Sequence, residues 1–308
     1  MKKRKIIALT TGIMLTMIST NVFAYEGYSL YADSIKNESI STNNVRLKGI
    51  DKVVNGNTFS ASTYQYNDNN QTILRDYTDC TIKYDYDENN QVKFVKGLMK
   101  TGSNSYVKHI KENFISEYKY DENGKVIEEI KSIYDKNAND LDGTPIDVYR
   151  IKYLYDGDKL YQKSAVPIQD SFSDKYFIRY EYNSQNQLSK ITEKINSSIN
   201  TLLLEYNSDG EISKATQNLN GNTKVIKINY ETDTDNIYSV YYVDPVKEWK
   251  VDMDFFALSY KPIKRLTEMD LKGNVLNTYE YSNKYQDNQI YESILNYNGI
   301  EIKYILKY

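Results

Sequence analysis

The feature that most constrains the fold of this chain is a short motif that recurs along most of its length. Each copy has an aromatic or apolar residue, any residue, a tyrosine, a turn rich in Asp, Asn and Gly, and a second run of alternating apolar residues. The best copy is Tyr118-Lys-Tyr120-Asp-Glu-Asn-Gly124-Lys-Val126. The second tyrosine recurs at Tyr66, Tyr86, Tyr120, Tyr155, Tyr182, Tyr206 and Tyr281, with Tyr230 as a degenerate member. Alternation at period two makes strands, and Asn-Gly or Asp-Gly pairs accept the positive φ of hairpin turns.

The intervals between the copies predict hairpins of unequal length. They range from 20 to 51 residues, whereas a strict solenoid would keep a constant period. The longest interval predicts a divergent copy around Trp249. Alternation places both tyrosines of one copy on the same face of the sheet. We therefore predict an all-β fold: a single long, curved antiparallel meander of hairpins that forms a half-barrel or a partly closed sheet.

The motif resembles the YD repeat of the Rhs family, whose pattern Tyr-x-Tyr-Asp-x-x-Gly-x-Val/Leu matches Tyr118 to Val126 position by position. The resemblance covers most of residues 59–308. Long Rhs chains use many such repeats to build a hollow shell around a toxin, and we expect no toxin domain in this chain. The chain is more similar to small secreted bacterial domains of unknown function that carry degenerate YD hairpins. The resemblance implies no catalytic residue.

The N-terminus has the three blocks of a secretory signal peptide. Lys2 to Lys5 are cationic, Ile6 to Ile18 form an apolar run, and small residues end at Ala24. A membrane anchor is the alternative, but the run is shorter than the about 20 residues that span a bilayer. We predict a signal peptide at 1–24, a flexible leader at 25–44, a repeat domain at 45–308, and secretion without a membrane span. Abundant Asn, Lys, Ile and Tyr are typical of AT-rich genomes and favour a Gram-positive source.

The charge and the scarcity of reactive side chains limit the classes of function. Removal of residues 1–24 takes four positive charges from a net charge of −3, which leaves −7. An acidic chain has no electrostatic footprint for nucleic acid. The single histidine, His109, and the single cysteine, Cys80, have no partner in sequence that would make a catalytic pair or a zinc site. We predict no cofactor and no enzymatic activity, with a carboxylate-dependent hydrolase as the alternative.

One loop has the composition of a calcium site. Asp135, Asn137, Asp140 and Asp142 place oxygen ligands at intervals before Gly143, as calcium loops do. If Gly143 is the sixth residue of such a loop, Ala138 is the first, where a carboxylate is needed. We therefore favour a plain hairpin-tip loop with at most weak calcium binding.

The aromatic rows give the best candidates for binding. Tyrosine and tryptophan rings stack on sugars and apolar groups, and they are usual anchors in binding sites. We predict a secreted, non-catalytic protein that binds an extracellular glycan, peptide or cell-wall component. The alternatives are that these rings are core and that the protein is a structural or interaction scaffold related to YD-repeat shells. The candidate binding residues are Tyr66, Tyr86, Tyr120, Tyr155, Tyr182 and Trp249.

Overall fold

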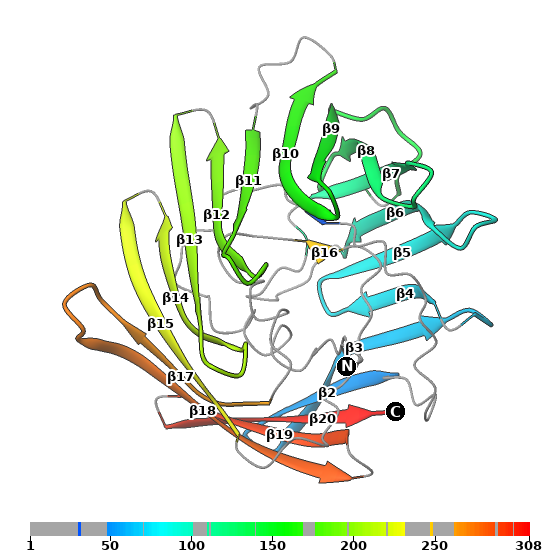
Figure 1. The fold of residues 1–308 in the computed structure, drawn as a ribbon. Coiled ribbons are helices and arrows are strands. Elements are labelled where there is room, and N and C mark those ends of the chain that lie inside the picture. The colour runs from blue at the N-terminus through cyan, green and yellow to red at the C-terminus, as the bar shows by residue number, and fades with distance from the viewer. Residues whose placement is uncertain are drawn as a thin grey trace.

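The computed structural model describes residues 30–31, 48–69, 71–100, 110, 112–138, 140–168, 176–195, 197–219, 221–231, 247–248, 262–286, 289–297 and 299–308. These residues form strands joined by turns, and the strands curve around a central axis (Figure 1), so the all-β prediction is confirmed. The strands of the main sheet are β2 (Gly49–Val54), β3 (Asn57–Tyr66), β4 (Thr72–Tyr77), β5 (Cys80–Tyr86), β6 (Val92–Met99), β7 (Asn113–Tyr120), β8 (Val126–Tyr134), β9 (Asp147–Asp156), β10 (Lys159–Pro167), β11 (Tyr176–Tyr182), β12 (Leu188–Ile195), β13 (Ser198–Tyr206), β14 (Ile212–Leu219), β15 (Asn222–Tyr230), β17 (Ile263–Met269), β18 (Val275–Gln286), β19 (Gln289–Tyr297) and β20 (Ile300–Lys307).

The prediction of an open or partly closed sheet is wrong, because the sheet closes into an antiparallel barrel of 18 strands. Strands that follow one another in sequence pair with each other, and β15 pairs with β17. The first barrel strand, β2, also pairs with the last, β20, along its whole length. An ion pair of 2.7 Å joins Lys307 Nζ to Asp51 Oδ2 across this seam. Closure satisfies the backbone groups that two free edges would leave exposed.

The turn of the motif has a local structure that explains its sequence. Asp121 Oδ1 accepts the backbone N–H groups of Asn123 at 2.9 Å and Lys125 at 2.8 Å. Gly124 has φ of 77°, a left-handed conformation that glycine adopts without strain. Asn183 and Asn207 accept the equivalent pairs of N–H groups in their own turns. The predicted role of Asp, Asn and Gly in these turns is therefore confirmed.

A β-bulge beside most motif turns supplies curvature, whereas the copy at Tyr281 lies inside β18 with no turn directly after it. In the pairing of β7 with β8, Lys119 lies opposite Glu128 and Tyr120 lies opposite Val126. Ile127 is therefore an extra residue in β8. The register shifts in the same way beside Tyr66, Tyr86, Tyr182 and Tyr206. Bulges bend a strand and increase its twist. A bulge repeated around the sheet curves it until its first and last strands meet.

The inner and outer faces of the barrel wall differ in burial. The first residue of the motif faces inward, and Tyr64, Tyr84, Tyr118, Tyr153 and Tyr180 are at most 5% exposed. On the outer face, polar and charged residues alternate with buried ones along β5, while other strands also expose apolar residues such as Leu154, Val166 and Leu203. Because consecutive strands are antiparallel, the motif turns lie at one end of the barrel, the motif end. The turns between β17 and β18 and between β19 and β20 lie at the other, the far end.

Several predicted segments lie wholly or largely outside the described residues. The signal peptide 1–24 and Trp249 lie outside, and in the predicted leader only β1 (Leu30–Tyr31) is described, where it pairs with β16 (Lys247–Glu248). The barrel begins at Gly49, inside the predicted domain 45–308. The barrel strand after Tyr230 is β17, so the described barrel has no separate hairpin at the divergent copy that we expected. Among the described residues, no helix has the length and apolar character needed to cross a membrane.

Candidate functional site: the inner wall of the barrel

The second tyrosine of the motif connects neighbouring hairpins. Tyr120 OH donates a hydrogen bond of 2.6 Å to the carbonyl of Val92, the first residue of β6 in the preceding hairpin. Tyr86 and Tyr182 donate in the same way to the carbonyls of Thr72 and Leu160. The same bond recurs at Tyr206, Tyr230 and Tyr308. These hydroxyl groups therefore tie each hairpin to the preceding one, next to the motif turn.

The five tyrosines predicted to bind a ligand all occupy this position. Tyr66, Tyr86, Tyr120, Tyr155 and Tyr182 are half-buried and pack against the core. The donated bonds of Tyr86, Tyr120 and Tyr182 direct their hydroxyls to protein carbonyls. Burial raises the pKa of Tyr120 above its usual value, with Asp87 as the next cause. The hypothesis that this row binds a ligand stays a prediction, and the structure gives the row a clear framework role.

The loop considered for calcium is arranged as a series of turns. Asp135 Oδ1 accepts the N–H of Asn137 at 2.8 Å, and Asp140 Oδ1 accepts that of Asp142 at 3.3 Å. The main-chain carbonyl of Asp135 accepts a hydrogen bond from Asn113 Nδ2, which ties the loop to β7. Within the described ranges, no group of three or more His, Cys, Asp or Glu side chains could hold a metal ion. His109 lies outside the described residues, and Cys80 is fully buried.

A buried carboxylate lies on the inner wall between β7 and β9. Glu129 of β8 is fully buried, and its two oxygens accept different hydroxyl groups. Ser116 Oγ donates to Oε1 at 2.7 Å, and Tyr153 OH donates to Oε2 at 2.6 Å. Lys163 Nζ lies 4.8 Å from the centre of the Tyr153 ring. The three strands are therefore joined through polar side chains as well as through their backbones.

This arrangement predicts a difference between two buried tyrosines. Tyr153→Phe removes a hydrogen bond to a buried carboxylate, and we expect it to lower the free energy of unfolding by roughly 2 kcal/mol. Tyr281 faces inward at 6% exposure, and its hydroxyl has no hydrogen-bond partner among the described residues. Tyr281→Phe should therefore leave stability unchanged or raise it slightly. Urea unfolding of both variants measures the difference, and equal losses would contradict the assignment.

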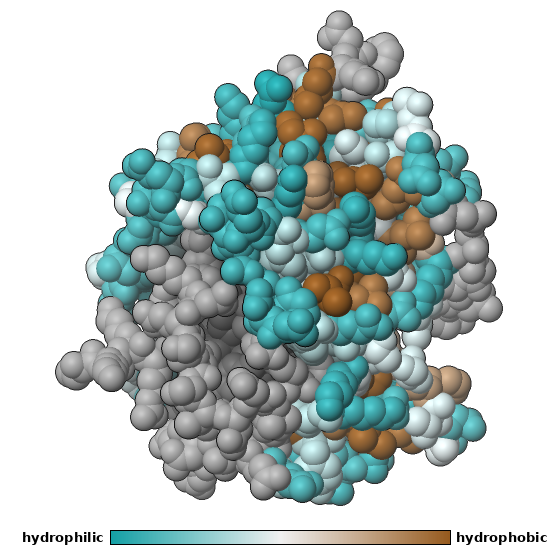
Figure 2. Space-filling view, turned by 90° about the vertical axis from the view of Figure 1, so that its right-hand side faces the viewer, coloured by the Kyte–Doolittle hydropathy of each residue, from teal (hydrophilic) through white to brown (hydrophobic). Residues whose placement is uncertain are grey.

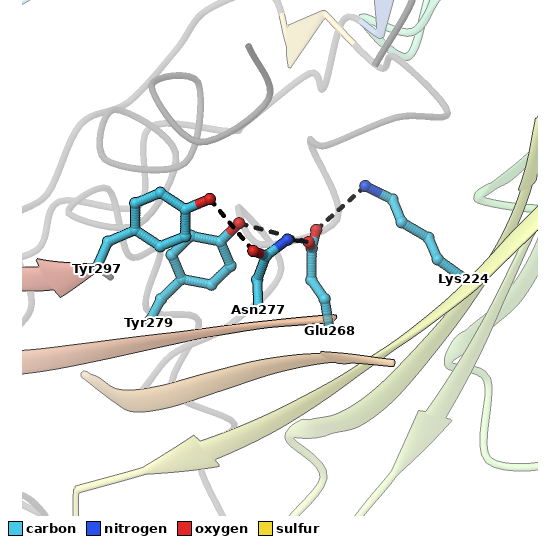
Figure 3. A network of polar contacts seen from close by, with 5 residues as sticks. All are labelled: Lys224, Glu268, Asn277, Tyr279 and Tyr297. Atoms are coloured by element: carbon cyan, nitrogen blue, oxygen red, sulfur yellow. Dashed lines mark hydrogen bonds and ion pairs between the residues drawn. The ribbon is translucent and has the colours of Figure 1, made fainter. Parts of the chain in front are cut away.

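A second polar network lies on the inner wall near the far end (Figure 3). Glu268 of β17 joins Lys224 of β15 through a contact of 3.1 Å between Nζ and Oε1. Asn277 Nδ2 donates to Glu268 Oε2 at 2.7 Å. Tyr279 OH donates to the same oxygen at 3.4 Å, and Tyr297 OH donates to Asn277 Oδ1 at 3.2 Å. The five side chains point from four strands to the same side of the sheet.

The two tyrosine rings of this network are stacked. Their centres are 4.6 Å apart and their planes differ by 12°. Tyr279 is 2% exposed, and burial, followed by the nearby Glu268, raises the pKa of its hydroxyl well above the usual range. The hydroxyl of Tyr279 thus stays protonated and keeps donating at any physiological pH. The network combines an aromatic surface with an ammonium, a carboxylate and an amide.

The sequence analysis missed this network. Lys224, Glu268 and Asn277 are ordinary polar residues in sequence, and none lies in a motif turn. The available signal is alternation: Lys224 precedes the inward residues Ile226 and Ile228 at intervals of two. A charged residue in an inward position of a strand needs a partner. Only the strand order, which pairs β15 with β17, brings Glu268 next to it.

Comparisons with known proteins assign no family to the chain. No family model and no curated protein matches it. It is similar to solved structures of two porin-like proteins, from Bacteroides vulgatus (11% identity, TM-score 0.40) and Bacteroides uniformis (12% identity, TM-score 0.42). These alignments cover 86% and 85% of this chain and 99% and 98% of the others. It also matches 14% of a chain in the structure of TcdB2-TccC3-TEV, over 82% of its own length, with 10% identity and a TM-score of 0.32. Likeness at this level leaves the function to be argued from the residues of the chain itself.

Proposed function

We propose that the protein is a non-catalytic framework for interactions outside the cell, with the outer wall of its barrel in water. The observation that carries this proposal is a series of ion pairs between outward side chains of neighbouring strands. Lys119 pairs with Glu128 at 2.7 Å, directly opposite it in the sheet. Opposed pairs of the same kind join Glu181 to Lys190, Glu205 to Lys214, Arg265 to Glu280 and Lys284 to Glu292.

These charges favour a setting in water over one in lipid. A barrel that crosses a membrane has an outward apolar band about 25 Å tall, and Lys or Arg at its centre costs about 2–4 kcal/mol per residue. Most of these ion pairs lie at or within two residues of the motif end of their strands, from β7 to the seam at β20 and β2. Outward charges also lie in the middle of strands, as Arg150 and Lys152 do in β9 and Arg179 does in β11. Figure 2 shows hydrophilic residues over much of the coloured surface, with hydrophobic areas between them. The predicted signal peptide supports a location outside the cell.

The arrangement of the tyrosine rows supports a framework rather than an enzyme. The first row is buried, and the hydroxyls of the second row bind the carbonyls of neighbouring hairpins. Rings used in this way stabilise the wall. Binding of an extracellular glycan, peptide or cell-wall component is the second candidate function, and the partly exposed network around Lys224 and Glu268 favours it. The Gram-positive source stays a prediction from composition.

Flotation with lipid vesicles tests the proposal. The protein purified without detergent is mixed with phosphatidylcholine vesicles and centrifuged through a density gradient. We expect it to stay in the aqueous fraction, because its outer wall is charged. Intact-mass analysis of protein from the culture medium tests the location, with cleavage after Ala24 as the expected result. Flotation with the vesicles, or a product that needs detergent to leave the membrane, would contradict the proposal.

A further inference from the structure

The inner wall is not uniformly buried, and a polar network near the far end is partly accessible. The inward carboxylate Glu129 is fully buried, whereas the side chain of Lys224 is 18% exposed and that of Glu268 is 13% exposed. Ile300, the first residue of β20, lies opposite Tyr297 and is 52% exposed. Accessible polar and apolar side chains therefore lie next to each other on one stretch of wall.

The backbone register places these residues in two adjacent rows. Tyr279, Tyr297 and Ile300 lie opposite one another across β18, β19 and β20, so an aromatic pair continues into an aliphatic residue. Glu268 lies opposite Asn277 in the next row toward the far end. Lys224 reaches Glu268 diagonally from β15. Because Tyr279 is 2% exposed, a ligand that covers both rows would meet Tyr297 and Ile300 as an apolar strip beside a polar strip.

The polar strip carries both signs of charge and both kinds of hydrogen-bonding group. Lys224 and Glu268 form an ion pair, so their charges offset each other and give no preference for a charged ligand. The ammonium of Lys224 has three N–H donors, and the described residues use one of them. The carboxylate of Glu268 offers acceptors, and Asn277 offers both a donor and an acceptor. A ligand with many hydroxyl groups, each able to donate and accept, suits this mixture.

We propose that this stretch of inner wall binds a neutral carbohydrate. A sugar ring would lie against the row of Tyr297 and Ile300, and its hydroxyl groups would bind Lys224, Glu268 and Asn277. Binding sites for small molecules combine an apolar or aromatic surface with a few polar groups that fix orientation, as here. The proposal names a ligand class for the second candidate function and rests on the framework proposal only for its extracellular setting.

Titration of the purified protein with short neutral oligosaccharides of glucose, N-acetylglucosamine and mannose tests the inference by calorimetry. We expect one of the three series to bind. Lys224→Met should weaken this binding at least tenfold, because it removes charge-assisted hydrogen bonds to the ligand. Lys214→Met is the matched control: Lys214 pairs with Glu205 at 2.6 Å on the outer face of the neighbouring strand, β14. It should leave the affinity unchanged.

A gentler variant separates loss of binding from loss of folding. Tyr297→Phe keeps the stacked ring and removes one hydroxyl, and we expect a melting temperature close to that of the wild type with a severalfold weaker affinity. Absence of binding to all three series at millimolar concentration would overturn the proposal, even if flotation supports a water-exposed barrel. Equal affinities of Lys224→Met and Lys214→Met would also overturn it. Binding of unstructured peptides in place of sugars would contradict the ligand class.

Discussion

We expect the barrel to unfold in one cooperative transition as the pH rises above about 10. Burial raises the pKa of Tyr64, Tyr118, Tyr153, Tyr281 and Tyr304 above the usual value of 10.0. A tyrosine with a raised folded-state pKa stabilises the fold fully below the unfolded pKa. Between the unfolded and the folded pKa, the unfolded chain has lost its proton and the folded chain keeps it. Stability therefore falls as the pH rises.

The size of this effect follows from proton linkage. Each such tyrosine removes about 1.4 kcal/mol per pH unit above 10, so five remove roughly 7 kcal/mol per unit. Whole domains are stable by about 5–15 kcal/mol. Circular dichroism followed together with near-ultraviolet phenolate absorbance measures the transition. The chain has 32 tyrosines, so the exposed ones give a first rise in absorbance, and a second rise from the buried ones should coincide with the loss of the sheet signal. If the full phenolate absorbance of all tyrosines appears while the sheet signal is intact, the five tyrosines are accessible to water.

We also expect Gly97→Ala to destabilise the protein strongly. Gly97 of β6 lies opposite Phe114 of β7, and both face the inside of the barrel. A Cβ atom at Gly97 would lie 2.3 Å from Phe114 Cε1, and the ring is only 6% exposed. Lys131 Nζ lies 4.7 Å from the centre of the same ring, which further limits its movement. Overpacking of this kind costs about 1–3 kcal/mol or more.

Thermal unfolding of three variants measures this effect. Gly143→Ala is the matched control, because nothing lies within 4 Å of a Cβ atom at Gly143, and its melting temperature should match the wild type. Adding Phe114→Leu to Gly97→Ala should recover part of the lost stability, because the smaller side chain vacates the contact. A Gly97→Ala variant as stable as the Gly143→Ala control would show that the ring does not lie over Gly97.

The sequence predicted the hairpins because their determinants are local. Asp121 and Gly124 set the geometry of one turn within five residues, and the alternation on both sides sets the faces of the strands. Closure depends on properties of the whole sheet, namely the number of strands and the curvature that the bulges add. The extra residue of each bulge, such as Ile127, looks in sequence like any other strand residue. A half-barrel or partly closed sheet was therefore the natural but wrong prediction.

The candidate sites were harder to predict for a related reason. The tyrosine pairs were visible in sequence, and their shared face was predicted correctly. The bond from Tyr120 to Val92 spans 28 residues, so the framework role of that hydroxyl emerges only when the hairpins lie side by side. Lys224 and Glu268 are 44 residues apart in sequence, because a long segment separates the end of β15 at Tyr230 from the start of β17 at Ile263. Partners that depend on such distant pairings could not be read from the motif.

An engineered disulfide across the seam tests the closed barrel most directly. In β2 and β20, Val53 and Lys303 lie opposite each other, at a spacing that suits a disulfide. We predict that Val53→Cys with Lys303→Cys, in a Cys80→Ser background, forms an intramolecular disulfide on mild oxidation in nearly every molecule. Lys227 in β15 is the control partner for Val53→Cys, because five strand spacings place it on the order of 20 Å away. A cross-link that forms only between molecules, or equally well with Lys227→Cys, would contradict closure of the barrel through β2 and β20.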